Sequence, residues 1–215
     1  MNLAIIKYNA GNIQSVLYAL ERIGVAAEVT DEVDKIRSAD KVIFPGVGEA
    51  SSAMKYLKER KLDHVIQKLQ QPVLGICLGM QLLCKHSEEN DTPCLGIVPL
   101  EVRKFKISRL EEDAEENNSK FPAGLTQPGR KIPQIGWNNI YALKSGLFNQ
   151  VKENSFIYNV HSYYAEDSSY TIAKCNYGLE YAAAIKKDNF YGVQFHAEKS
   201  AEVGEKILKN FLNGI

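Results

Sequence analysis

The sequence lacks an excess of charge of either sign. Its 215 residues include 26 Lys and Arg and 26 Asp and Glu, and the sequence pI is about 6.9. Proteins that bind nucleic acid or anionic membranes through net charge are usually strongly basic. The balance of charge therefore gives no indication of either partner, and we expect neither nucleic acid nor a membrane to be bound.

Long apolar runs are also missing. No run approaches the roughly 18 residues of a membrane span, and the start at Met1 lacks a basic stretch followed by an apolar one. A chain of this length is large enough for one sizeable core. We therefore expect a single domain of residues 1–215 in the cytoplasm.

Cysteine is scarce. The four cysteines, Cys77, Cys84, Cys94 and Cys175, are irregularly spaced, which predicts reduced thiols and not a disulfide framework. Cys84, His86 and Cys94 have side chains that can bind a metal. They include no Cys-x-x-Cys pair, however, and three ligands are too few for a closed zinc site. We therefore expect no metal and no other cofactor.

The first half of the chain alternates apolar runs with helical patterns. Strands are predicted at residues 2–7, 25–30, 41–44 and 73–76, and helices at residues 13–23, 33–39, 51–59 and 62–70. This alternation predicts an α/β fold with a doubly wound, mainly parallel central sheet. In such a sheet the ligand crevice lies at the carboxyl ends of the strands, where residues 45–48 and Cys77 are found.

The second half has shorter alternating runs that predict an added antiparallel, strand-rich part. These runs are residues 98–105, 140–143, 156–160, 170–174, 181–185 and 190–195. Ser200 is predicted to cap a final amphipathic helix. Residues 109–130 are acidic, rich in Asn and weakly apolar, which predicts a mobile surface insertion, with a partner-binding loop as the alternative.

Cys77 is the first candidate for chemistry. It follows the apolar run 73–76, precedes a helical pattern and has Gly75 and Gly79 on either side. A sharp strand-to-helix turn needs small residues at these places, because a Cβ would crowd the neighbouring backbone. A thiol at the start of a helix is favoured as thiolate. The alternative is an inert, buried cysteine.

The second candidate stretch contains His196 and Glu198. If the chain stays extended through Ala197, the two side chains point the same way, so the carboxylate orients one imidazole nitrogen and leaves the other for a thiol. A thiol, a base and a group that orients the base form an activated nucleophile. The alternatives are a packed histidine at a strand end and a solvated glutamate.

Together, residues 75–81 (GICLGMQ) and 193–198 (VQFHAE) closely resemble the class I, or triad, glutamine amidotransferases, which have a flavodoxin-like fold. Five further stretches resemble the glutaminase subunits of the imidazole glycerol phosphate synthases of histidine biosynthesis. These are residues 8–12 (YNAGN), 45–48 (PGVG), 132–138 (IPQIGWN), 160–164 (VHSYY) and 198–200 (EKS).

The resemblance implies that Cys77 attacks the side-chain amide of glutamine, with His196 as base and Glu198 as its orienting group. Backbone N–H groups of Leu78 and of the segment Gly46 and Val47 would hold the oxyanion. Positions that would hold the substrate's α-amino and carboxylate end are Gly48, Gln81, Glu89, Ser162 and Tyr163. For Glu89, a solvated residue in an acidic run is the alternative.

The resemblance also implies a heterodimer with a (β/α)₈-barrel cyclase subunit. Ammonia from glutamine would pass to that subunit, which makes imidazole glycerol phosphate and aminoimidazole carboxamide ribotide. Positions at or near the interface or the ammonia gate are Asn12, Trp137, Tyr158 and Lys199. Trp137 is the sole tryptophan, and core packing is its alternative role.

The sequence departs from the family pattern at several positions. Ala197 stands where proline is usual, and we expect alanine to adopt the same extended conformation. Gln134 and Ile135 replace His-Met, and Asn159 replaces an aromatic residue. Two alternatives therefore stay open: a paralogous glutaminase that feeds a different synthase, such as one for modified sugars, and a catalytically silent regulatory partner.

Overall fold

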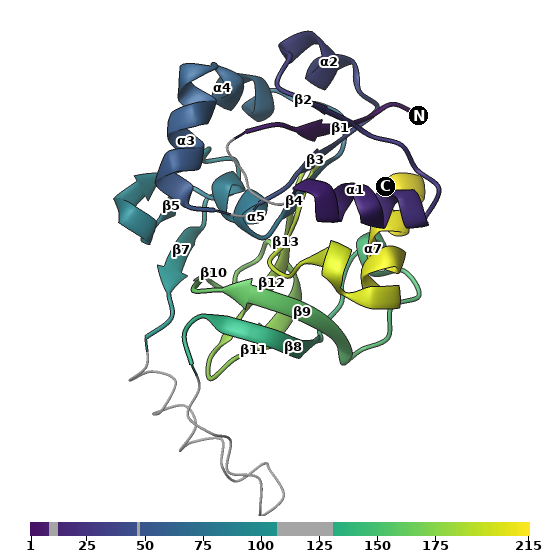
Figure 1. The fold of residues 1–215 in the computed structure, drawn as a ribbon. Coiled ribbons are helices and arrows are strands. Elements are labelled where there is room, and N and C mark those ends of the chain that lie inside the picture. Colours follow the sequence, from purple (N-terminus) through teal and green to yellow (C-terminus); the bar gives the residue numbers. More distant parts are fainter. Residues whose placement is uncertain (9–12, 47, 107–130) are drawn as a thin grey trace, which may run out of the picture.

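A computed structural model describes residues 1–8, 13–46, 48–106 and 131–215. A large mixed sheet runs through these residues, with helices on both faces (Figure 1). The strand order is β2-β1-β3-β4-β13-β12-β10-β7-β5-β6, and β11 pairs with β12 beside this path. The α/β fold predicted from the alternating pattern, with a mainly parallel central sheet, is confirmed.

The parallel part of the sheet consists of five neighbouring strands. In spatial order they are β2 (Glu28–Thr30), β1 (Leu3–Ile6), β3 (Lys41–Phe44), β4 (Val73–Ile76) and β13 (Phe190–Val193). All but the edge strand β2 are buried along their whole length, because helices cover both faces. The carboxyl ends of β3, β4 and β13 therefore meet at one edge of the sheet, where the ligand crevice was predicted.

The helices form two layers, which follow from the alternation of side chains along each strand. On β1, Leu3 and Ile5 pack in the cluster that includes α1 and α7, while Ala4 and Ile6 pack in the cluster that includes the other helices. The first layer consists of α1 (Ile13–Arg22) and α7 (Ala201–Gly214). The second consists of α2 (Val33–Ser38), α3 (Ala50–Glu59), α4 (Leu62–Gln67) and α5 (Leu78–Leu83).

The antiparallel part extends the sheet beyond β13, as predicted. It contains β12 (Glu180–Lys187), β11 (Thr171–Asn176), β10 (Tyr163–Ala165) and β7 (Glu101–Lys104). At the edge, the short strand β5 (His86–Ser87) pairs parallel with β7 and antiparallel with β6 (Thr92–Pro93). A second, two-stranded sheet pairs β8 (Gln134–Ile140) with β9 (Ser155–His161). We call this pair the β8–β9 ribbon; it lies at the front of Figure 1.

The structure differs from the local predictions in several places. The strand expected at residues 140–143 is instead β8, which ends at Ile140, because exposed and polar residues in its middle hide the apolar alternation. The strand β10 was not predicted. The Ser200 hydroxyl does not cap α7; it donates to His196 O at 2.7 Å and accepts from the Tyr158 N–H at 2.9 Å.

Two further observations concern the predictions on composition. Across the described ranges, no helix is both long and apolar enough to cross a membrane. All four cysteines are free. The insertion predicted at residues 109–130 lies outside the described residues.

Candidate active site

Cys77 occupies a sharp turn between β4 and α5, as the flanking glycines predict. Its backbone has φ 52° and ψ −109°, a conformation that side-chain-bearing residues rarely adopt. A Cβ on Gly79 would lie 1.9 Å from the carbonyl oxygen of Phe44, and one on Gly75 would lie 2.7 Å from the N–H of Met80. Only glycine at these positions lets the turn pack against the end of β3 and against itself.

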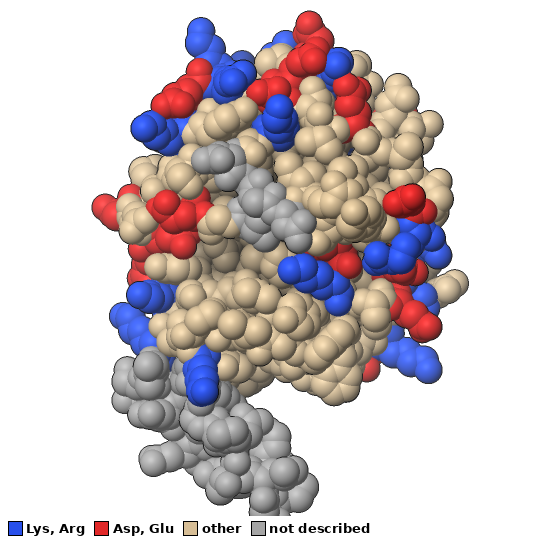
Figure 2. Space-filling view, in the orientation of Figure 1, with Lys and Arg blue, Asp and Glu red and all other residues tan. Residues whose placement is uncertain are grey.

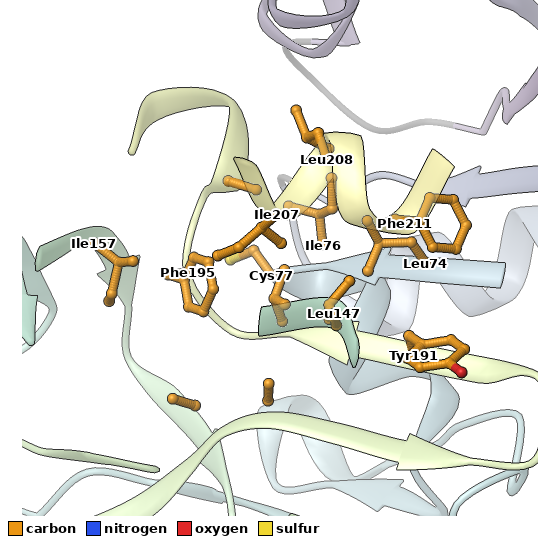
Figure 3. Packing of buried hydrophobic residues seen from close by; sticks show 14 of the residues in the cluster. Leu74, Ile76, Cys77, Leu147, Ile157, Tyr191, Phe195, Ile207, Leu208 and Phe211 are labelled. Atoms are coloured by element: carbon orange, nitrogen blue, oxygen red, sulfur yellow. The ribbon is translucent and has the colours of Figure 1, made fainter. Parts of the chain in front are cut away.

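The Cys77 side chain is buried at the edge of the cluster under α7 (Figure 3). Its sulfur lies 3.8 Å from the carbonyl oxygen of Val160 and 3.7 Å from Nε2 of Gln194. The parallel register pairs Val193 with Ile76, so the residues that follow each of them, Gln194 and Cys77, emerge side by side. The thiol therefore sits among hydrogen-bonding groups at the carboxyl ends of two strands.

His196 bridges the thiol and a carboxylate. Its Nδ1 lies 2.7 Å from Oε1 of Glu198, and the ring lines the same cavity as Cys77. Burial alone would lower the pKa of His196, but the hydrogen bonds and charges of Cys77 and Glu198 outweigh it and raise the pKa to about 10. An imidazole with this pKa is charged at neutral pH when it faces a thiolate. Cys77, His196 and Glu198 thus have the geometry of an activated nucleophile.

The predicted extended conformation at Ala197 is wrong. Residues Ala197–Lys199 form a turn of 3₁₀ helix, and only His196 before it is extended. The two side chains still meet, at 2.7 Å, because His196 is extended and only the residues after it turn. Ala197 itself is buried, and a Cβ on Gly204 of α7 would lie 1.8 Å from its carbonyl oxygen, so α7 packs directly on this turn.

A cavity of about 340 Å³ opens beside the thiol, a volume within the usual range for small-molecule sites. Both Cys77 and His196 line it, whereas Glu198 lies behind the imidazole. Eight other residues predicted for the site line it as well: Gly46, Gly48, Leu78, Gln81, Glu89, Ser162, Tyr163 and Lys199. Trp137 and Tyr158 lie on the β8–β9 ribbon and do not line the cavity. Asn12 and Val47 lie outside the described residues.

Gly46 brings the end of β3 against the nucleophile turn. A Cβ there would lie 2.2 Å from the N–H nitrogen of Gly79 and 2.6 Å from the carbonyl oxygen of Ile76. Tyr8 fixes the preceding peptide, because its buried hydroxyl donates to the Pro45 carbonyl. Backbone N–H groups from this segment and from Leu78, the first residue of α5, are thus suited to hold an oxyanion beside the sulfur.

Two polar side chains in the cavity are suited to an amino acid. Glu89 is half-buried and its carboxylate accepts a 2.7 Å hydrogen bond from the Ala50 N–H; burial raises its pKa, so a cationic ligand would be a favourable partner. Gln81 is buried and donates from Nε2 to the carbonyl oxygen of Tyr163 at 3.0 Å. The alternative of a solvated Glu89 does not agree with these contacts.

Four residues of the site were not predicted. Pro133, Val160 and His161 line the cavity, and Gln194 contacts the sulfur. His161 and Val160 belong to the stretch VHSYY, from which only the two residues after His161 were chosen. Gln194 belongs to the stretch VQFHAE and stands two residues before the proposed base, and these were the signals that could have found it.

Comparison with known proteins decides the family. A family model described as glutamine amidotransferase class-I matches residues 4–215. The chain belongs to the class I glutamine amidotransferases. The match covers the nucleophile turn, the His196–Glu198 pair and the cavity residues between them, so the whole site lies within the family's own domain.

Curated relatives of this amidotransferase cover nearly its full length. A Bacteroides fragilis protein named "imidazole glycerol phosphate synthase subunit HisH" is 51% identical over 212 residues, with 99% of each chain covered. Proteins with the same name from Bacteroides thetaiotaomicron and Haemophilus influenzae are 47% and 42% identical. These alignments cover 99% and 100% of this chain, and 100% and 98% of the relatives.

Solved structures agree with the fold of this amidotransferase. A crystal structure described as a glutamine amidotransferase matches with a TM-score of 0.69 at 14% identity and covers 99% of both chains. A glutamine amidotransferase from Thermotoga maritima matches with a TM-score of 0.60 at 16% identity, over 100% of this chain and 83% of that one. At these identities the likeness concerns the fold alone.

Proposed function

We propose that this chain is the glutaminase subunit of an imidazole glycerol phosphate synthase. In this role it hydrolyses glutamine to glutamate and ammonia, and supplies the ammonia to a cyclase subunit in histidine biosynthesis. The names of relatives at 42–51% identity over nearly the whole chain support the pathway. The observation that carries the chemistry is the imidazole of His196, which is hydrogen-bonded to the Glu198 carboxylate and lines one cavity together with the Cys77 thiol.

The first half of the reaction is attack by the Cys77 thiolate on the side-chain amide carbon of glutamine. The carbonyl oxygen becomes an oxyanion, which the backbone N–H groups of Leu78 and of the 46–47 segment stabilise. A single such donor commonly contributes about 3–4 kcal/mol to transition-state stabilisation. The charged His196 imidazole then donates its proton to the departing nitrogen, which leaves as ammonia and a glutamyl thioester on Cys77.

The second half releases glutamate. The now neutral His196 accepts a proton from a water molecule as the water attacks the thioester carbon, and the sulfur leaves as thiolate. The 2.7 Å contact with Glu198 keeps Nδ1 protonated in this step, so the other ring nitrogen is available as the base. The imidazolium–thiolate pair is then restored for the next turnover.

The polar groups of the cavity orient the amino-acid end of the substrate. The Glu89 carboxylate suits the α-ammonium group, because a partly desolvated carboxylate gains from a cationic partner. The backbones of Gly48, Ser162 and Tyr163 and the side chain of Gln81 complete the proposed glutamine site. A substrate without an α-ammonium group is therefore expected to bind poorly.

The β8–β9 ribbon is the proposed docking surface for the cyclase. Ile135, Trp137 and Phe156 expose 63%, 54% and 61% of their surface, and Figure 2 shows a largely uncharged area over the ribbon. The Trp137 ring packs edge-on against Tyr158 at 5.7 Å, which leaves its other surface free to anchor a partner. For the partner we propose a (β/α)₈ barrel, and for Lys199, which lines the cavity, a role at the interface or the ammonia gate.

The test uses the purified chain with the cyclase subunit of the same cell. We expect glutamine hydrolysis by the chain alone to be weak and to rise sharply when the cyclase and its nucleotide substrate are added. Equal rates with and without the cyclase would contradict the coupling. No synthesis from the ribulosyl substrate, with intact hydrolysis, would favour a glutaminase that feeds a different synthase.

A Cys77→Ala variant separates the two half-reactions. It should abolish glutamine-dependent synthesis by the complex but leave synthesis from added ammonium salt unchanged, because the cyclase does not need the thiol. Retained glutaminase activity would remove Cys77 from the mechanism. If the wild-type chain in complex with the cyclase does not hydrolyse glutamine either, the chain is a catalytically silent partner.

We also propose that residues 1–215 act as a single glutamine amidotransferase domain in the cytoplasm. The family match over residues 4–215 supports the first point. Free thiols at all four cysteines are typical of a reducing compartment and support the second. Limited proteolysis and cell fractionation test these points, and a stable fragment or a membrane-associated pool would contradict them.

A further inference from the structure

Gln194 is a fully buried amide that contacts the candidate nucleophile from the strand next to it. Its Nε2 lies 3.7 Å from Cys77 Sγ, and its Oε1 lies 2.9 Å from Nε2 of Gln81. A 2.8 Å backbone hydrogen bond from its N–H to the carbonyl oxygen of Ala183 fixes its position in the sheet. The backbone and the side-chain oxygen are therefore both held, and the side-chain NH₂ group lies toward the sulfur.

The direction of these hydrogen bonds is set by the carbonyl oxygen of Tyr163. This oxygen can only accept, so the Gln81 side chain must turn its NH₂ group toward it, at 3.0 Å. The same NH₂ group faces Gln194, which must therefore present its oxygen. The remaining NH₂ group of Gln194 then points at the sulfur. A second contact holds the Tyr163 carbonyl oxygen in place, because Nδ1 of His161 lies 2.7 Å from it.

We propose that Gln194 is a further catalytic residue, whose side-chain N–H donates to the Cys77 sulfur, stabilises the thiolate and aims it at the substrate. This rests on the proposed role of Cys77 as nucleophile. A hydrogen bond to the charged form of a group favours that form, and the thiolate is the reactive form of cysteine. Since the donor is oriented before the reaction, no reorganisation is needed when glutamine binds.

The arrangement also gives Gln81 a defined role. Both hydrogens of its amide are taken, by Tyr163 O and by Gln194 Oε1, so only its own oxygen is left for a ligand. Gln81 therefore accepts a hydrogen bond from the substrate and does not donate one. The chain from Tyr163 through Gln81 and Gln194 to Cys77 connects the wall of the cavity with the sulfur.

The experiment measures the rate of alkylation of Cys77 by iodoacetamide as a function of pH, with the modified peptide quantified by mass spectrometry. The variants are Gln194→Leu and Gln194→Met, which remove the donor, and Gln194→Glu, which places a carboxyl group beside the sulfur. Asn189→Leu is the matched control: it precedes the same strand, and its amide donates to the carbonyl oxygens of Leu69 and Gln71 at 2.9 and 2.8 Å, away from the thiol.

We expect the pH midpoint of alkylation to rise by about one unit in Gln194→Leu and Gln194→Met, which makes the reaction about tenfold slower at pH values below the wild-type midpoint. In Gln194→Glu the rise should be larger, because a second negative charge opposes the thiolate. Asn189→Leu should keep the wild-type midpoint, even if its melting temperature falls. Two variants without the donor are used so that the test can still be made if one of them does not fold.

An unchanged midpoint in a folded Gln194 variant would overturn the proposal, and so would an equal shift in Asn189→Leu. The assay needs no glutamine, so the outcome is independent of the proposed function. If the wild type fails to hydrolyse glutamine but the midpoint shifts as expected, the function is refuted and the role of Gln194 at the thiol stands. If the wild type hydrolyses glutamine normally and the midpoint does not shift in the variants, the proposed function stands and the role of Gln194 is refuted.

Discussion

Substitution of Gly46 by alanine gives the sharpest test of the geometry around the nucleophile. The added Cβ would lie 2.2 Å from Gly79 N, 2.6 Å from Ile76 O and 2.6 Å from Leu78 Cβ. Ordinary contacts begin at 3.4 Å, and two of these three atoms belong to the backbone of the nucleophile turn. Because the turn cannot yield by rotating a side chain, the segment at Gly46 must move away from it by about 1 Å.

The magnitude follows from this displacement. Overpacking of a tight site costs about 1–3 kcal/mol of unfolding free energy, and each kcal/mol lowers the melting temperature of a chain of this size by about 2–4 °C. The effect on catalysis is expected to be larger. A shift of about 1 Å in a catalytic group costs on the order of 100-fold in rate, which matches the loss of one oxyanion donor.

The assay compares glutamine-dependent with ammonia-dependent synthesis by the complex, alongside thermal unfolding. Gly46→Ala should lose glutamine-dependent activity about 100-fold while ammonia-dependent synthesis is kept. Gly214→Ala is the control, because a Cβ at this helical position meets nothing within 4 Å and alanine favours a helix. Wild-type melting temperature together with wild-type glutaminase activity in Gly46→Ala would refute the packing of β3 against the nucleophile turn.

Three further predictions concern single contacts. Glu198→Gln should lower glutaminase activity by about 10²–10⁴-fold with the fold intact, because the imidazole loses the carboxylate that orients and stabilises it; an activity near wild type would contradict the triad. The pKa of His196, raised to about 10 from 6.5, means that its charged form favours folding below pH 6.5 and that this contribution is lost as the pH rises through 10. The melting temperature should therefore fall more steeply between pH 6.5 and about 10 in the wild type than in His196→Gln, and parallel curves would argue against the charged pair. Lys41→Met should destabilise the fold by about 1–3 kcal/mol, since buried Lys41 donates to the carbonyl oxygens of Phe211 and Ile215 at the end of α7. The control is Lys55→Met, at an exposed position. Equal melting temperatures of the two variants would contradict the prediction.

The parallel half of the fold could be predicted because its signals are local. The strands β3 and β4 coincide with the predicted residues 41–44 and 73–76, since each is a continuous apolar run that ends at glycine, proline or the nucleophile turn. The helix α4 ends at Gln67, three residues before the predicted end. A helix end depends on tertiary contacts that the apolar spacing does not record.

The parts that were missed depend on contacts between distant segments. The contact of Gln194 with Cys77 follows from the register of β13 on β4, which a single sequence does not specify. The ribbon strand β8 carries Trp137 and two asparagines in its middle, so its apolar period is weak, and its pairing with β9 decides its conformation. The core-packing alternative for Trp137 is likewise settled only by its exposure, which is 54%.

The backbone of Tyr158 has a consequence for how docking and chemistry can be linked. Its carbonyl oxygen accepts the His196 N–H at 2.9 Å, and its N–H donates to the Ser200 hydroxyl at 2.9 Å. The same residue turns its ring toward Trp137 on the ribbon that we propose as the docking surface. A displacement of the ribbon would thus reach the base directly through one backbone hydrogen bond and indirectly through the Ser200 hydroxyl, which donates to the His196 carbonyl. We expect a covalent clamp across the ribbon, added in the absence of the cyclase, to change the turnover of glutamine, because β9 contacts both His196 and Cys77.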